Sequence, residues 1–200
     1  MFGKTDEEEV PLSITTGPLA GTVSPRGIVY ASMFGAATAA GAYMVVPIPP
    51  VPITLQTLFL GIAGLLLGAR LGAMSQVVYV MTGAIGLPVF AGGKAGLGVL
   101  FGPTGGYLLG FIAGAYTIGK LAELRPAWGA AWAVFALSAG TVVIYTLGIA
   151  QLSLVAQLPV PRAVAVGVVP FLPGDAVKIG VAAVVALKAR PHLNLRKSAR

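Results

Sequence analysis

Six apolar segments, almost free of charged residues, constrain what this chain can fold into. They lie at residues 27–46, 55–68, 71–87, 104–121, 128–150 and 171–187. Hydrophobic residues make up 56% of the chain and charged residues only 10%, whereas a soluble domain usually has about 25% charged residues. Such a chain cannot cover its surface with polar groups in water. We therefore expect an integral membrane protein.

We expect each apolar segment to be a helix. Backbone polar groups in lipid need hydrogen-bond partners within the segment, and the sequence lacks the alternation of barrel strands. Glycine is frequent inside the segments, where it favours close contact between helices. The prediction is an all-α, compact bundle of six transmembrane helices over residues 27–189. An N-terminal tail (residues 1–26) and a basic C-terminal tail (residues 190–200) flank the bundle.

The basic residues predict the orientation of the bundle, because cytoplasmic loops carry an excess of Lys and Arg. Six spans place both termini on one side of the membrane. Of the 13 Lys and Arg residues, ten then share that side, two lie opposite and Lys178 lies within a span. We therefore expect a multi-pass cell-membrane protein with both termini in the cytoplasm. The two opposite residues are Lys94 and Arg162, and the ten are Lys4, Arg26, Arg70, Lys120, Arg125, Lys188, Arg190, Arg196, Lys197 and Arg200.

Three connections on the outward side are rich in proline or glycine. They cover residues 47–54, 86–106 and 151–170. Long irregular loops in compact proteins are often functional. We expect these three to converge as a lid over the outer end of the bundle.

The sixth segment contains two ionisable residues, Asp175 and Lys178, near its outward end. Residues three positions apart share a helix face. A charge at the centre of a bilayer costs about 2.5–3.5 kcal/mol, so such residues usually face the bundle interior. The two side chains can form a structural ion pair. Alternatively, they form a polar patch at the bottom of an outward cavity, where Asp175 accepts and Lys178 donates hydrogen bonds.

Other side chains are candidate ligand contacts. Lys94 follows Gly93 in the stretch FAGGKAGLG, where glycines let the backbone approach a ligand. Lys94 could bind a carboxylate, or it could be a solvated loop lysine. Several polar groups in or beside the spans could bond either a ligand or another helix, and Gln56 is the strongest of them because it follows an outer loop directly. They are Thr54, Gln56, Gln76, Tyr79 and Tyr145.

Small residues recur every four positions in the first segment, as Ala31, Gly35 and Ala39 and again as Ser32, Ala36 and Ala40. Such faces let helices approach closely. They serve either packing within the bundle or docking of another membrane protein.

The sequence excludes several function classes. The chain has no cysteine and a single histidine, so a zinc or iron site lacks ligands and we expect no metal and no cofactor. The stretch GPTGGYLLG lacks the Lys-Ser/Thr ending of a phosphate-binding loop. The few basic residues sit between apolar segments, so we expect no nucleic-acid partner. An intramembrane enzyme would have to use Asp175 as its acid or base, and a passive channel would need polar residues along every helix.

Three stretches together resemble the BioY family, the biotin-binding S components of energy-coupling factor (ECF) transporters. They are PIPPVPITLQTLFLGIAGLLLGARLGA, GAIGLPVFAGGKAGLGVLFGPTGGYLLGF and PFLPGDAVKI, in this order along the chain. The resemblance implies a subunit, not an enzyme, that captures biotin from outside with high affinity. Its implied partners are biotin, membrane lipid, a transmembrane coupling subunit and two ATP-binding subunits. Another small vitamin on the same scaffold is the alternative.

The resemblance also implies roles for residues. Asp175 and Lys178 match ligand-binding residues of the family, and the small-residue face of the first helix matches its docking surface. That surface corresponds here to Ala31, Gly35, Ala36, Ala39 and Ala40. The expected ligand-binding residues are Asp175, Lys178, Lys94, Gln56, Gly93, Tyr79, Tyr145, Thr54 and Phe90.

Overall fold

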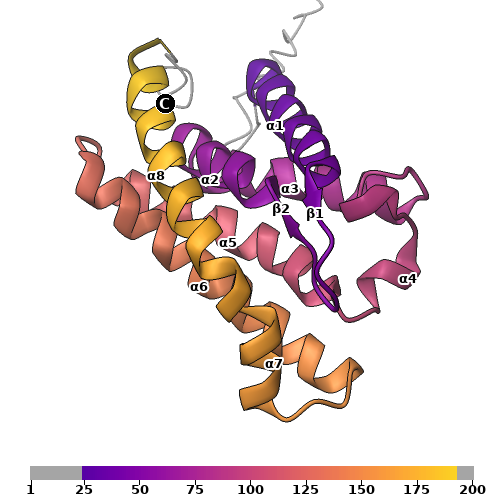
Figure 1. The fold of residues 1–200 in the computed structure, drawn as a ribbon. Helices are drawn as coiled ribbons and strands as arrows, with labels where there is room; N and C mark the ends of the chain where they lie inside the picture. Colours follow the sequence, from indigo (N-terminus) through magenta and orange to yellow (C-terminus); the bar gives the residue numbers. More distant parts are fainter. Residues whose placement is uncertain (1–23, 193–200) are drawn as a thin grey trace, which may run out of the picture.

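The computed structural model describes residues 24–192, which form a bundle of helices (Figure 1). The long helices match the six apolar segments, so the all-α prediction is confirmed. They are α1 (Pro25–Tyr43), α2 (Gln56–Leu67), α3 (Ala69–Ala84), α5 (Gly105–Leu124), α6 (Ala130–Val155) and α8 (Leu172–Ala189). Most of the two predicted tails lies outside the described residues.

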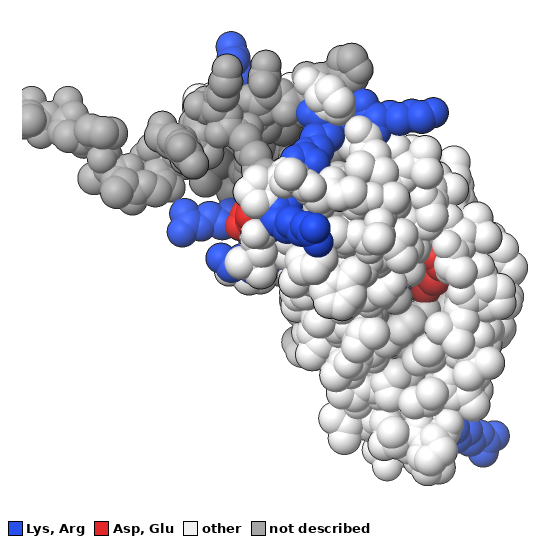
Figure 2. All heavy atoms as spheres, turned by 90° about the vertical axis from the view of Figure 1, so that its left-hand side faces the viewer, with Lys and Arg blue, Asp and Glu red and all other residues white. Residues whose placement is uncertain are grey.

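Within residues 24–192, two helical stretches are long and apolar enough to cross a membrane, Ala130–Val155 and Val160–Ala189. The number of spans therefore stays a prediction. The described basic residues on the predicted cytoplasmic side gather at the end of the bundle where α8 finishes (Figures 1 and 2). These residues are Arg26, Arg70, Lys120, Arg125, Lys188 and Arg190.

Local sequence signals account for the helix boundaries. Ser24 Oγ accepts a hydrogen bond from Gly27 N at 3.2 Å, and Pro25 occupies the first turn of α1. Between α2 and α3 the chain turns at Gly68, whose φ of 84° favours glycine. There Glu123 Oε1 accepts from Ala69 N at 2.8 Å and caps α3.

The outer connections are more regular than predicted. Residues 45–54 form a hairpin of β1 (Val45–Val46) and β2 (Ile53–Thr54), with Val46 paired to Ile53. The prediction of an irregular third connection is wrong, because α6 extends to Val155 and α7 (Val160–Gly167) follows. Pro161 in the first turn of α7 suits a helix start. The remaining short elements are η1 (Ala91–Gly93), α4 (Leu97–Leu100), η2 (Val169–Phe171) and η3 (Arg190–His192).

The small residues of α1 divide between two faces. Ala31 is 1% exposed, and a Cβ on the buried Gly35 would lie 2.9 Å from Ser75 O of α3. These two residues pack inside the bundle, so the prediction that they dock a partner is wrong. Ala36 and Ala40 are exposed and Ala39 is half-buried. The free small-residue surface of α1 is therefore centred on Ala36 and Ala40.

We predict opposite effects of two Gly→Ala substitutions on stability in detergent. Gly35→Ala forces a Cβ against the Ser75 carbonyl and should cost about 1–3 kcal/mol. Gly180→Ala places its Cβ in open space on α8 and should leave stability unchanged or raise it by up to about 1 kcal/mol. Thermal unfolding of the purified variants measures both. Equal melting temperatures for the two variants would contradict the assigned α1–α3 packing.

Candidate ligand site

A cavity lies between helices α2, α5, α6 and α8 and the two connections at residues 47–54 and 86–106. It holds about 710 Å³ of empty space, its open mouth included. All predicted ligand-binding residues line it except Tyr79 and Gly93. The lining residues are Val51, Pro52, Thr54, Gln56, Thr57, Phe90, Ala91, Lys94, Val99, Thr104, Tyr107, Leu108, Phe111, Ile144, Tyr145, Phe171, Asp175 and Lys178.

Asp175 and Lys178 form an ion pair in the wall of this cavity. Lys178 Nζ lies 2.9 Å from Asp175 Oδ1, and the Tyr145 hydroxyl of α6 donates to Asp175 Oδ2. Asp175 stands in the first turn of α8, where the helix dipole favours a carboxylate. Asp175 is 6% exposed and Lys178 is 8% exposed. Both ionisable groups are thus paired and largely buried at the cavity surface.

Gln56 belongs to a second polar cluster. Thr54 Oγ1 donates to Gln56 Oε1 at 2.7 Å, and Gln56 Nε2 donates to the Tyr79 hydroxyl. Tyr79 is 1% exposed and lies behind Gln56, with its ring edge-on to Phe90 at 5.7 Å between centroids. Tyr79 therefore orients the Gln56 amide and does not line the cavity, contrary to the prediction.

Lys94 lies at the cavity mouth on a tight loop. Gly92 and Gly93 have φ of 70° and 74°, and Phe90 N donates to Lys94 O at 3.0 Å. The Phe90 ring is buried and anchors this loop, whereas the Lys94 side chain is exposed. Gly93 does not line the cavity, contrary to the prediction, but its backbone turn sets the position of Lys94.

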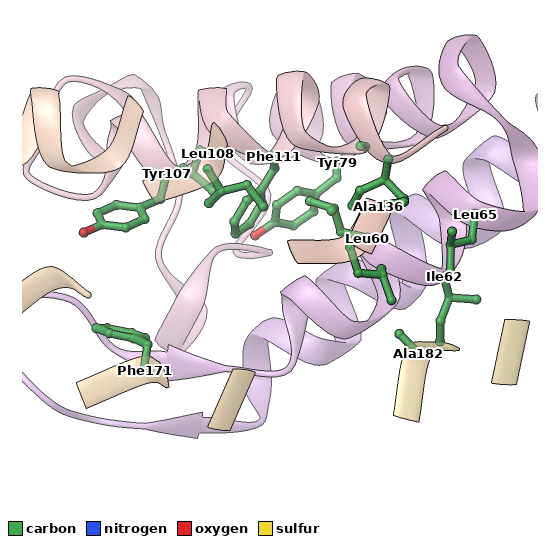
Figure 3. Close-up of a cluster of buried hydrophobic side chains, with 14 of the residues drawn as sticks. Leu60, Ile62, Leu65, Tyr79, Tyr107, Leu108, Phe111, Ala136, Phe171 and Ala182 are labelled. Atoms are coloured by element: carbon green, nitrogen blue, oxygen red, sulfur yellow. The ribbon is translucent and has the colours of Figure 1, made fainter. Parts of the chain in front are cut away.

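Sequence reasoning missed most of the apolar wall. Tyr107, Leu108 and Phe111 follow one another along α5, and Phe171 lies across from them (Figure 3). Tyr107 OH donates to Gly167 O at 2.9 Å and so ties α5 to α7. The available signals were positional, because Tyr107 directly follows GPTGG and Phe171 stands just before the Asp175 turn.

Comparison with known proteins places this chain in a family. The model of the BioY family matches residues 15–195. The chain belongs to the BioY family. The biotin transporter BioY of Thermotoga maritima is 42% identical over 82% of this chain and 96% of its own length. The biotin transporter BioY of Rhizobium etli is 43% identical over 68% of this chain and 76% of its own length.

A solved structure has the same fold. It is the crystal structure of the S-component for biotin from an ECF-type ABC transporter, with a TM-score of 0.80 and 25% sequence identity. It matches 90% of this chain and 100% of its own chain. BioY membership confirms the family resemblance and identifies the chain as a membrane protein.

Proposed function

We propose that this BioY protein is the substrate-binding subunit of a biotin uptake system. It captures biotin at the outer face and delivers it across the membrane together with an ECF energy-coupling module. The observation that carries this proposal is a cavity with a buried Asp175–Lys178 pair in a chain whose relatives are biotin transporters. The chain acts in transport and is not an enzyme.

The cavity suits the chemistry of biotin. The ureido ring of biotin has two N–H donors and one carbonyl acceptor, and the valerate chain ends in a carboxylate. Asp175 accepts from a ureido N–H, and Lys178 donates to the ureido carbonyl. The apolar rings lie against Tyr107, Phe171 and other apolar lining residues. Lys94 at the mouth meets the carboxylate.

The orientation and the partners follow from the same reasoning. Six spans with both termini in the cytoplasm put the basic end of the bundle inside, since positive charge favours that side. The cavity then opens outward. The exposed face of α1 around Ala36 and Ala40 docks the transmembrane coupling subunit, to which two ATP-binding subunits attach. Small residues there permit close helix contact.

Biotin binding by the purified protein tests the proposal. We expect saturable binding in detergent by calorimetry or with radiolabelled biotin. Asp175→Asn keeps the shape but loses the charge-assisted bond, so affinity should fall by about 1.5–3 kcal/mol, or roughly 10- to 150-fold. No binding at micromolar biotin would refute the proposal. Binding of a different small vitamin would favour the alternative substrate on the same scaffold.

The role of Lys94 can be tested with an uncharged ligand. Lys94→Met should weaken binding of biotin, whose carboxylate loses its partner, and leave binding of biotinamide unchanged. For an exposed charge pair the expected loss is about 0.2–1 kcal/mol, so the comparison needs precise titrations at low salt. An equal loss for both ligands would show that Lys94 does not contact the carboxylate.

The docking face can be tested separately from binding. Ala36→Leu and Ala40→Leu add bulk to an exposed surface, so the isolated proteins should bind biotin normally. Co-purification with the coupling subunit and biotin uptake by cells should both be lost. Ala150→Leu, an exposed alanine on α6, serves as the matched control. Normal uptake by both α1 variants would move the docking surface elsewhere.

A further inference from the structure

Thr57 stands out among the polar residues that line the cavity. Its Oγ1 is buried, yet it has no hydrogen-bond partner within residues 24–192. The buried polar groups around it are occupied: Gln56 bonds Thr54 and Tyr79, and Asp175 bonds Lys178 and Tyr145. A buried hydroxyl without a partner is unfavourable, so such groups usually have a ligand, a water or a functional role.

The position of Thr57 in the fold explains why its hydroxyl is free. Each of the other threonines in the described helices donates to the carbonyl four residues earlier, as Thr141 does to Leu137 O at 3.0 Å. The rest of that group is Thr38, Thr82, Thr117 and Thr146. Thr57 is the second residue of α2, and the residue four positions earlier, Ile53, belongs to β2. The usual internal acceptor is therefore missing.

Thr57 also lies close to the ion pair. A smaller hollow adjoins the main cavity, and Thr57, Ile144, Asp175 and Lys178 line both. These residues form the boundary between the two spaces. A ligand group that reaches Asp175 and Lys178 therefore also comes close to Thr57.

We infer that Thr57 Oγ1 is a third polar contact for the ureido ring, a conclusion that rests on the proposed function. The ring offers two N–H donors and one carbonyl. Asp175 accepts one N–H and Lys178 donates to the carbonyl, which leaves the second N–H without a partner. Thr57 Oγ1 accepts this N–H. The three side chains then satisfy every polar atom of the ureido ring, so Thr57 contributes to selecting cyclic ureas.

Two substitutions at Thr57 separate the hydroxyl from the shape of the side chain. Thr57→Val replaces the hydroxyl by a methyl group and should weaken biotin binding about five- to tenfold, the effect of one neutral hydrogen bond. Thr57→Ser keeps the hydroxyl and loses one methyl group, so it should bind within about fourfold of the wild type and more tightly than Thr57→Val. Thr141→Val, in the adjoining hollow, removes a hydroxyl that is already bonded to its own helix and should leave affinity unchanged.

The melting temperature of the biotin-free protein distinguishes a ligand contact from a structural role of Thr57. Because the Thr57 hydroxyl has no partner in the described part of the chain, Thr57→Val should not lower the melting temperature of the biotin-free protein. The increase in melting temperature produced by biotin should shrink. A lower melting temperature without biotin would mean a structural role and overturn the inference.

Dethiobiotin has the ureido ring but lacks the sulfur ring, so it identifies the ligand group that Thr57 meets. Thr57→Val should weaken dethiobiotin and biotin by the same factor, and a loss confined to biotin would overturn the ureido assignment. Equal affinity of the wild type and Thr57→Val for biotin would overturn the inference alone. Absence of biotin binding by the wild type would overturn the proposed function and the inference together.

Discussion

The buried ion pair between Asp175 and Lys178 is the interaction on which the site depends. Either charge left alone in this setting would cost several kcal/mol, on the order of 3–5 when one partner of a buried pair is removed. The pair forms within α8, and the Tyr145 hydroxyl of α6 satisfies the second carboxylate oxygen. Gly61 lets α2 pack closely against α6, because a Cβ at this position would lie 2.7 Å from Leu137 Cδ2. Close packing of these helices therefore also brings together the side chains of the polar cavity wall.

The hydrogen bonds that Asp175 already makes limit the affinity that a ligand can gain by bonding it. A ureido N–H that bonds Asp175 shares or replaces a contact that Tyr145 or Lys178 already makes, so the net gain is smaller than the new bond alone suggests. A ligand N–H that bonds Thr57 Oγ1, as inferred above, meets an oxygen that has no partner among residues 24–192. On the proposed binding mode, the paired groups hold the geometry of the site, whereas Thr57 adds affinity.

The sequence predicted the helices well because charge and hydropathy change sharply at their ends. That Asp175 and Lys178 share a helix face followed from their spacing of three, and the structure shows that they also pair. The sequence did not predict that Tyr79 and Gly35 are buried among the helices. Which face of a helix turns inward depends on neighbours that are distant in sequence, and the low polarity of every face of these helices removes the usual amphipathic signal. The wall formed by Tyr107 and Phe171 is likewise a product of tertiary packing.

The connections around the cavity position its mouth. Phe90 is buried and fixes the loop that presents the exposed Lys94. Gln151 Nε2 donates to Leu100 O at 2.7 Å and to Gly102 O at 2.8 Å. These two bonds tie the next part of that connection to α6. These anchors hold the mouth in place beside the hydrogen-bonded polar wall. An exposed cation at the mouth acts through water and is screened by salt, whereas the buried groups act at short range in a medium of low dielectric constant. In the proposed site, selectivity for the ring would therefore reside in the wall, and the mouth would mainly attract the charged end of the ligand.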